Sequence, residues 1–139
     1  MKSAEDIESY LMRVACPYER VAAGFWIVKL EGHENLAISI AGPVVAFRLK
    51  VVDLPVAGRE TLYRTLLTLN TNEMVHGAFG LEGEAVVIVH ALEMENLDFN
   101  EFQAVIDDMT MAVAKHYPYL SKLVDSHVGA GSPASATTA

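Results

Sequence analysis

The stretch that decides the fold runs from residue 35 to residue 51 and has the sequence NLAISIAGPVVAFRLKV. On both sides of Gly42-Pro43 the apolar residues occupy every second position, which is the period of a β-strand with one buried face. Gly-Pro favours a turn, so we expect two antiparallel strands that pack one face on a core. The residues expected to point into that core are Leu36, Ile38, Ile40, Val45, Phe47, Leu49 and Val51.

Further elements extend the pattern in both directions along the chain. Strand-like apolar segments cover residues 21–30, 75–81 and 85–92, with Glu82-Gly83 as a tight turn between the last two. Apolar spacing of three and four predicts helices from Ser3 towards Pro17, over residues 59–70, and after a capping box of Asp98 and Glu101. We therefore expect an α+β fold with the order α-βββ-α-ββ-α, in which helices pack on a five-stranded antiparallel sheet.

The end of the last helix and the end of the domain are predicted from breakers and composition. Pro118 is expected to stop the long helix and to open a short one that carries Leu120, Leu123 and Val124. Residues 129–139 are Gly, Ala, Ser and Thr with one proline, a composition typical of a flexible tail. The 139 residues are therefore expected to form one domain over residues 1–128, followed by that tail.

Charge and cysteine content limit the classes of partner and the compartment. Eighteen acidic and ten basic residues give a formal net charge of −8, which repels nucleic acid and anionic membrane surfaces. A single cysteine, Cys16, rules out an internal disulfide and fits a reducing compartment. The first residues lack the apolar core of a signal peptide, and no apolar run is long enough to span a membrane. We expect a cytoplasmic protein with protein partners, without nucleic-acid binding or membrane insertion.

The residues that could carry chemistry are not arranged in any catalytic or metal-binding frame. The five histidines (His33, His76, His90, His116 and His127) show no metal-ligand spacing, and no serine lies in a nucleophile elbow. We expect His90 to be a hydrogen-bonded core histidine and Cys16 to be a small apolar filler. Gly77 and Gly80 within a strand pattern indicate a bulge or a close backbone approach rather than a phosphate loop. The sequence thus predicts no enzyme, no cofactor and no catalytic, cofactor-binding or metal-binding residue.

Hydrophobic surface is the remaining functional feature, because two strands are apolar on both faces. In residues 21–30, Phe25 and Ile27 occupy one parity, and Trp26, Val28 and Leu30 occupy the other. If Phe25 and Ile27 face the core, then Trp26, Val28 and Leu30 form an exposed protein-binding patch with a tryptophan anchor. The alternative is that Trp26 is itself a core residue. The second sheet face is either covered by another helix or serves as a dimer or partner surface, and we expect a homodimer.

From residue 35 to residue 123 the sequence resembles the YbjN family, whose fold is that of the type III secretion chaperones. The segments that carry the resemblance are Gly42-Pro43-Val44-Val45-Ala46-Phe47-Arg48, Leu66-Leu67-Thr68-Leu69-Asn70, His76-Gly77-Ala78-Phe79-Gly80-Leu81, Glu95-Asn96-Leu97-Asp98-Phe99-Asn100-Glu101 and His116-Tyr117-Pro118. The resemblance implies a small, acidic, dimer-prone α+β sandwich without catalytic residues. Secretion chaperones of this fold hold segments of client proteins in a non-globular form.

Three functions remain open at this stage. The first is a chaperone-like or adaptor module that binds a client segment on an apolar sheet face or along a sheet edge. The second is a regulatory module of a signalling or envelope-stress system that acts through protein contacts. The third is an enzyme with an unrecognised site, which a convergent polar pocket would support.

Overall fold

The residues from 35 to 51 form the central hairpin of the sheet in the computed structural model, which describes residues 2–130 and the side chains of residues 2–126. Strand β3 (Leu36–Ala41) pairs antiparallel with β4 (Val44–Asp53), and Ile38 lies opposite Phe47. Both of these side chains are buried. Gly42 turns the chain with a φ of +58°, a conformation that L side chains rarely adopt. The hairpin and its core face are therefore confirmed.

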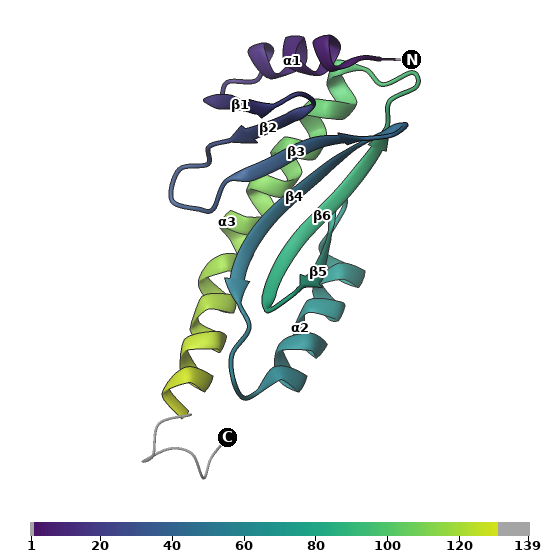
Figure 1. The fold of residues 1–139 in the computed structure, drawn as a ribbon. Coiled ribbons are helices and arrows are strands. Elements are labelled where there is room, and N and C mark those ends of the chain that lie inside the picture. Colours follow the sequence, from purple (N-terminus) through teal and green to yellow (C-terminus); the bar gives the residue numbers. More distant parts are fainter. Residues whose placement is uncertain (1, 131–139) are drawn as a thin grey trace.

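The described residues form a six-stranded antiparallel sheet with the strand order β1-β2-β3-β4-β6-β5, shown in Figure 1. The other strands are β1 (Tyr18–Ala22), β2 (Phe25–Val28), β5 (Ala78–Glu82) and β6 (Ala85–Glu93). The α+β class and the antiparallel sheet are confirmed, but the sheet has six strands where five were expected. The segment expected as one strand over residues 21–30 contains a turn at residues 23–24, and Gly24 has a φ of +68° there. The turn divides the segment between β1 and β2.

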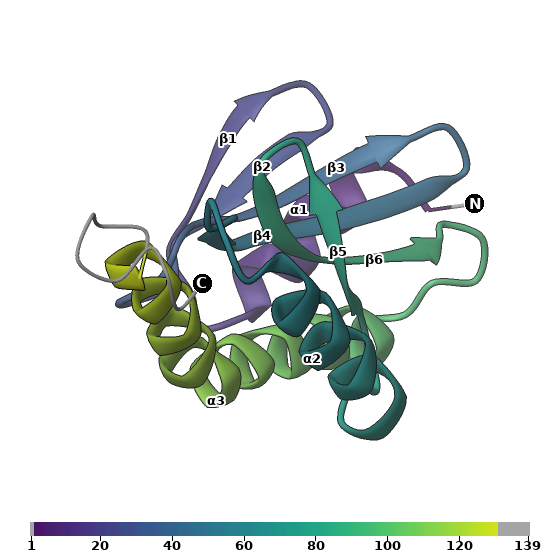
Figure 2. The same ribbon diagram turned by 90° about the horizontal axis from the view of Figure 1, so that it is seen from below.

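Three helices of the described region complete the fold: α1 (Ala4–Arg13), α2 (Arg59–Asn72) and α3 (Phe99–Ala130). Figure 2 shows α2 and α3 on the same side of the sheet. On that side the rings of Phe102 in α3 and Phe47 in β4 lie 5.6 Å apart. The predicted capping box of α3 is confirmed, since the Glu101 amide donates to Asp98 Oδ1 at 2.8 Å and the Asp98 amide donates to Glu101 Oε1 at 3.3 Å.

Helix α3 does not stop at Pro118, so the prediction of two separate helices is wrong. Proline removes one backbone hydrogen bond and crowds the preceding turn, which kinks a helix when packing holds its two halves in place. Leu120, beyond the proline, is fully buried and provides such packing. Figure 2 shows the axis of α3 changing direction towards its yellow end. The helix includes Gly129 and Ala130, the first two residues of the expected tail, and residues 131–139 lie outside the described part of the chain.

Trp26 lies in the core, which corrects the prediction of an exposed patch. Trp26 and Val28 are each 1% exposed and Leu30 is 8% exposed. The indole Nε1–H of Trp26 donates to Glu8 Oε1 of α1 at 2.8 Å. Because α1 packs over this parity of β2, Trp26, Val28 and Leu30 face the helices, and Phe25 and Ile27 point to the opposite face.

We predict that Trp26→Ala lowers the free energy of unfolding by about 3–5 kcal/mol, because it empties a large core volume and leaves Glu8 without its indole donor. Chemical denaturation of purified protein measures the change. Met12→Ala is the control, since Met12 is a large apolar residue of α1 that is 70% exposed. A loss at Trp26 no larger than the loss at Met12 would contradict the core assignment.

Candidate interaction surfaces

Strand β1 leaves one backbone edge of the sheet open. It is the outermost strand beside β2, and four of its five residues are exposed. The Lys29 amide donates to the Pro17 carbonyl at 2.9 Å. Since amides alternate in direction along an antiparallel ladder, this bond places the amides of Tyr18 and Arg20 on the side away from β2. These free backbone groups can pair with an extended segment of another chain.

A groove between α1 and the β1–β2 hairpin lies beside this open edge. It has a volume of about 460 Å³ and is lined by Ala4, Glu5, Glu8, Ser9, Met12, Arg20, Ala23, Gly24 and Trp26. Glu8 fixes the floor, because it accepts the Trp26 indole N–H and also the Tyr18 hydroxyl at 3.0 Å. Burial and the bond to Glu8 both raise the pKa of Tyr18. The exposed side chain of Met12 adds apolar surface to the lining.

The opposite edge strand, β5, is closed by a side chain. The Asn70 amide in α2 donates from Nδ2 to the Phe79 carbonyl at 3.1 Å, and Asn70 Oδ1 accepts the Phe79 amide at 2.7 Å. The N–H and C=O of one residue point to the same side of a strand, so both groups of Phe79 face away from β6 and towards α2. Asn70 thus occupies two of the backbone groups that an added strand would use, which makes β1 the more open of the two edges.

The outer face of the sheet carries a shallow apolar hollow of about 550 Å³. Its floor consists of the small side chains Ala37, Ser39, Ala46 and Ala91, with Phe25 on one side and Arg48 and Val89 on the other. Arg48 pairs with Glu82 across the sheet. None of the helices in the described region covers this hollow, so the sequence-based alternative of a covering helix is not met by residues 2–130.

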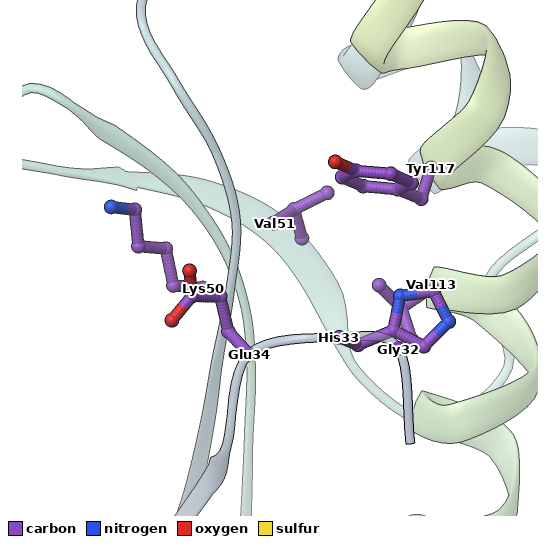
Figure 3. A pocket seen from close by; sticks show the side chains of 7 residues that line it. All are labelled: Gly32, His33, Glu34, Lys50, Val51, Val113 and Tyr117. Carbon is purple, nitrogen blue, oxygen red and sulfur yellow. The ribbon is translucent and has the colours of Figure 1, made fainter. Parts of the chain in front are cut away.

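Figure 3 shows a smaller pocket of about 330 Å³ between the β2–β3 connection, the end of β4 and α3. Val51 and Val113 lie between two polar sides, one with Glu34 and Lys50 and the other with His33 and Tyr117. The His33 and Tyr117 rings meet edge to face at 5.6 Å, so His33 is half-buried rather than simply solvated. Lys50 Nζ pairs with Asp53 at 2.9 Å, and this bond raises the pKa of Lys50. The lysine is thereby kept charged, and the pocket offers no evident proton-transfer pair.

Histidines gather where the connection of residues 73–77 joins α2 to β5. The His90 ring in β6 accepts the Gly77 amide at its Nδ1, at 3.1 Å, and lies 5.6 Å from the His76 ring. His76 in turn contacts the Asp108 carboxylate of α3. His90 is hydrogen-bonded as predicted from the sequence, but it is half-buried and not a core residue. Sequence spacing did not predict the cluster, because β5–β6 pairing is what brings residues 76, 77 and 90 together.

The described residues provide little support for other kinds of site. Among the side chains of residues 2–126, no group of three or more His, Cys, Asp and Glu is placed to hold a metal ion. In the same part of the chain, no helix is both long enough and apolar enough to cross a membrane. Cys16 is half-buried and packs against the core, as expected of an apolar filler. The surfaces with distinctive features are the β1 edge with its groove and the outer sheet face.

One family model matches the chain, and several solved structures share its fold. The family model CesT_Tir_1 matches residues 1–126. Among solved structures, the heterodimeric complex ExoU-SpcU from the type III secretion system of Pseudomonas aeruginosa contains a chain with 10% identity and a TM-score of 0.68, and the match covers 86% of this chain and 98% of that one. YbjN from E. coli has 10% identity and a TM-score of 0.63, with 85% and 93% covered. The HopA1-SchA chaperone-effector complex has 10% identity and a TM-score of 0.59, with 83% and 90% covered. No curated protein sequence matches significantly.

We predict that His116 makes the fold sensitive to acid. Burial against Phe79, and next the Lys115 charge, lower the pKa of His116 below its ordinary value. Above about pH 6.5 the folded and unfolded states are both neutral here. Below this pH the unfolded state takes up a proton on His116 before the folded state does. The free energy of unfolding therefore falls as the pH falls, by at most about 1.4 kcal/mol per pH unit.

Chemical denaturation over this pH range tests the prediction with His116→Phe, which keeps a ring against Phe79 but does not titrate. The variant is expected to lose less stability on acidification than the wild type does. His33→Phe, on the other side of α3, is the control and should leave the wild-type pH dependence in place. Equal acid sensitivity in the wild type and in His116→Phe would contradict the assignment.

Proposed function

The chain belongs to the CesT_Tir_1 family of type III secretion chaperones, non-catalytic protein-binding modules, and we propose that it binds an extended client segment along β1 and in the α1 groove. The family membership confirms the resemblance inferred from the sequence. The client adds a strand to the open edge and places apolar side chains in the groove between α1 and the β1–β2 hairpin. Binding in this way holds the client segment unfolded while it is attached.

The observation that carries the proposal is the open edge of β1 beside an apolar groove. Strand addition supplies affinity through backbone hydrogen bonds that do not depend on the client sequence, and side-chain pockets next to the edge supply selectivity. Met12 offers an apolar contact there, and Arg20 offers a charged one. The difference between the two edges supports the choice, because Asn70 occupies β5 and no side-chain clamp of that kind lies on β1 among residues 2–130.

We predict that Arg20→Pro weakens client binding and leaves the fold intact. The Arg20 amide points away from β2, so proline at this position removes a group that the client would use and breaks no bond of the β1–β2 ladder. The matched control is Arg20→Ala, which keeps the amide and loses only the side chain. Client captured from the native cell, trimmed by limited proteolysis to its bound segment, is titrated against both variants.

The expected result is at least a tenfold weaker affinity for Arg20→Pro than for Arg20→Ala, with equal thermal unfolding of the two variants. Equal affinity of the two variants for the bound segment would exclude strand addition at this edge. Binding weakened to the same extent in both variants would place the recognition in the Arg20 side chain and not in the backbone.

We further propose that the outer sheet face joins two copies of the chain in a homodimer. The face is apolar, and Val89 at its rim is 40% exposed. Its floor of alanine and serine side chains admits the larger side chains of a facing surface. Contact between two such faces would remove from water the apolar surface that the helices leave bare.

We predict that Ala46→Arg makes the protein monomeric, because it places a second cation beside Arg48 in the middle of the apolar hollow. Light scattering at micromolar concentration measures the mass, which is expected to be that of two chains for the wild type. Ala114→Arg, an identical change at an exposed position of α3, is the control and should remain dimeric. A wild-type mass of one chain would refute the homodimer, and a dimeric Ala46→Arg protein would place its interface elsewhere.

A further inference from the structure

The residue just before β5 is held to β6 by an unusual contact. The backbone amide of Gly77 donates to the imidazole Nδ1 of His90 at 3.1 Å, in place of a backbone carbonyl. An imidazole nitrogen accepts a hydrogen bond only through its lone pair, so the contact requires His90 to be neutral with its proton on Nε2. Protonation of His90 converts the acceptor into a donor that faces another donor. The bond therefore exists in only one protonation state of the ring.

Gly77 fits the sheet closely at this point. Its φ is +98°, and a Cβ there would lie 3.1 Å from Ile88 Cγ2 and 3.4 Å from the Val89 carbonyl oxygen. The glycine backbone thus lies directly on β6, in a conformation that L side chains rarely adopt. Gly77 has no side chain that could anchor it. The hydrogen bond from its backbone amide to His90 therefore contributes much of what holds it on β6.

The groups around His90 favour its neutral form. Burial, and next the charge of His76, lower the pKa of His90 below its ordinary value. The ring faces the His76 ring from the 73–77 connection and pairs across the sheet with Phe47 of β4, which does not titrate. Asp108 of α3 reaches this cluster through His76, while Glu73 and Lys115 pair with each other at 2.5 Å. None of these groups provides His90 with a carboxylate contact that would stabilise its cation.

We propose that His90 is a proton-sensitive latch on β5: its neutral imidazole holds Gly77 on β6, and its protonation releases Gly77 and loosens the start of this edge strand. The His76–Asp108 contact responds differently, because a protonated His76 keeps the carboxylate as its partner. Acidification thus moves Gly77 off β6 while the neighbouring His76 stays attached to α3. The device is a local opening, and it does not depend on any client.

Hydrogen exchange at the Gly77 amide tests the latch directly. If one proton is taken up only by the open form, the protection factor of this amide falls by about tenfold per pH unit below about pH 6.5. In His90→Asn the side-chain oxygen can take the place of Nδ1 as acceptor without titrating, so the protection factor should not vary with pH. His33→Asn, a histidine outside the cluster, is the matched control and should behave like the wild type.

Two results would overturn the latch. One is a wild-type protection factor for Gly77 that stays constant on acidification, or that falls equally in His90→Asn. The other is an NMR titration of the His90 ring with a midpoint at or above about 6.5, which would show that the folded state accepts the proton without cost. The titration uses the wild type, so it decides the question even if His90→Asn does not fold.

Discussion

The antiparallel ladder between β4 and β6 is the constraint on which the rest of the structure depends. Nine residue pairs join the two strands, from Val44 opposite Glu93 to Asp53 opposite Ala85. The ladder fixes which side chains face α3, because a shift of one residue would turn every one of them to the other side of the sheet. It also positions the outer sheet face and the His90 ring, since the outer parity of the same strands lines the apolar hollow and the inner parity of β6 carries His90.

Local sequence patterns predicted most of the fold, because each depends on neighbours only a few residues apart. The alternation around the β3–β4 hairpin and the Asp98–Glu101 cap are of this kind. The prediction of the buried face was wrong where both parities of a strand are apolar, because the alternation of apolar and polar residues then does not indicate which face is buried. Trp26 is the clearest case: its side is decided by Glu8, eighteen residues earlier and on a different element. The prediction that the helix ends at Pro118 is wrong for a related reason. Packing of the buried Leu120 stabilises the helix beyond a residue that would end an isolated helix.

The candidate sites were predictable in kind but not in position. The apolar second face of the sheet follows from the sequence, whereas the identity of its residues follows only once the parity of β2 is known. The open edge was missed because β1 was not separated from β2, although Gly24 in the middle of the apolar run was a signal of the break. The histidine cluster has one signal in the sequence: His90 shares the parity of Val86 and Ile88, which face the core. A titratable ring at such a position needs a hydrogen-bond partner. That partner is the backbone amide of Gly77, which no sequence pattern identifies.

The side-chain clamp of Asn70 on Phe79 has a consequence for assembly in concentrated solution. A sheet with two free edges can pair edge to edge with other copies, so that the last strand of one molecule lies beside the first strand of the next. Such head-to-tail association does not close on itself and leads to fibres. Asn70 occupies part of this second edge, so an added strand meets fewer free backbone groups there and further growth is disfavoured. The exposed edge of β1 can then accept an added strand with less tendency to form a polymer.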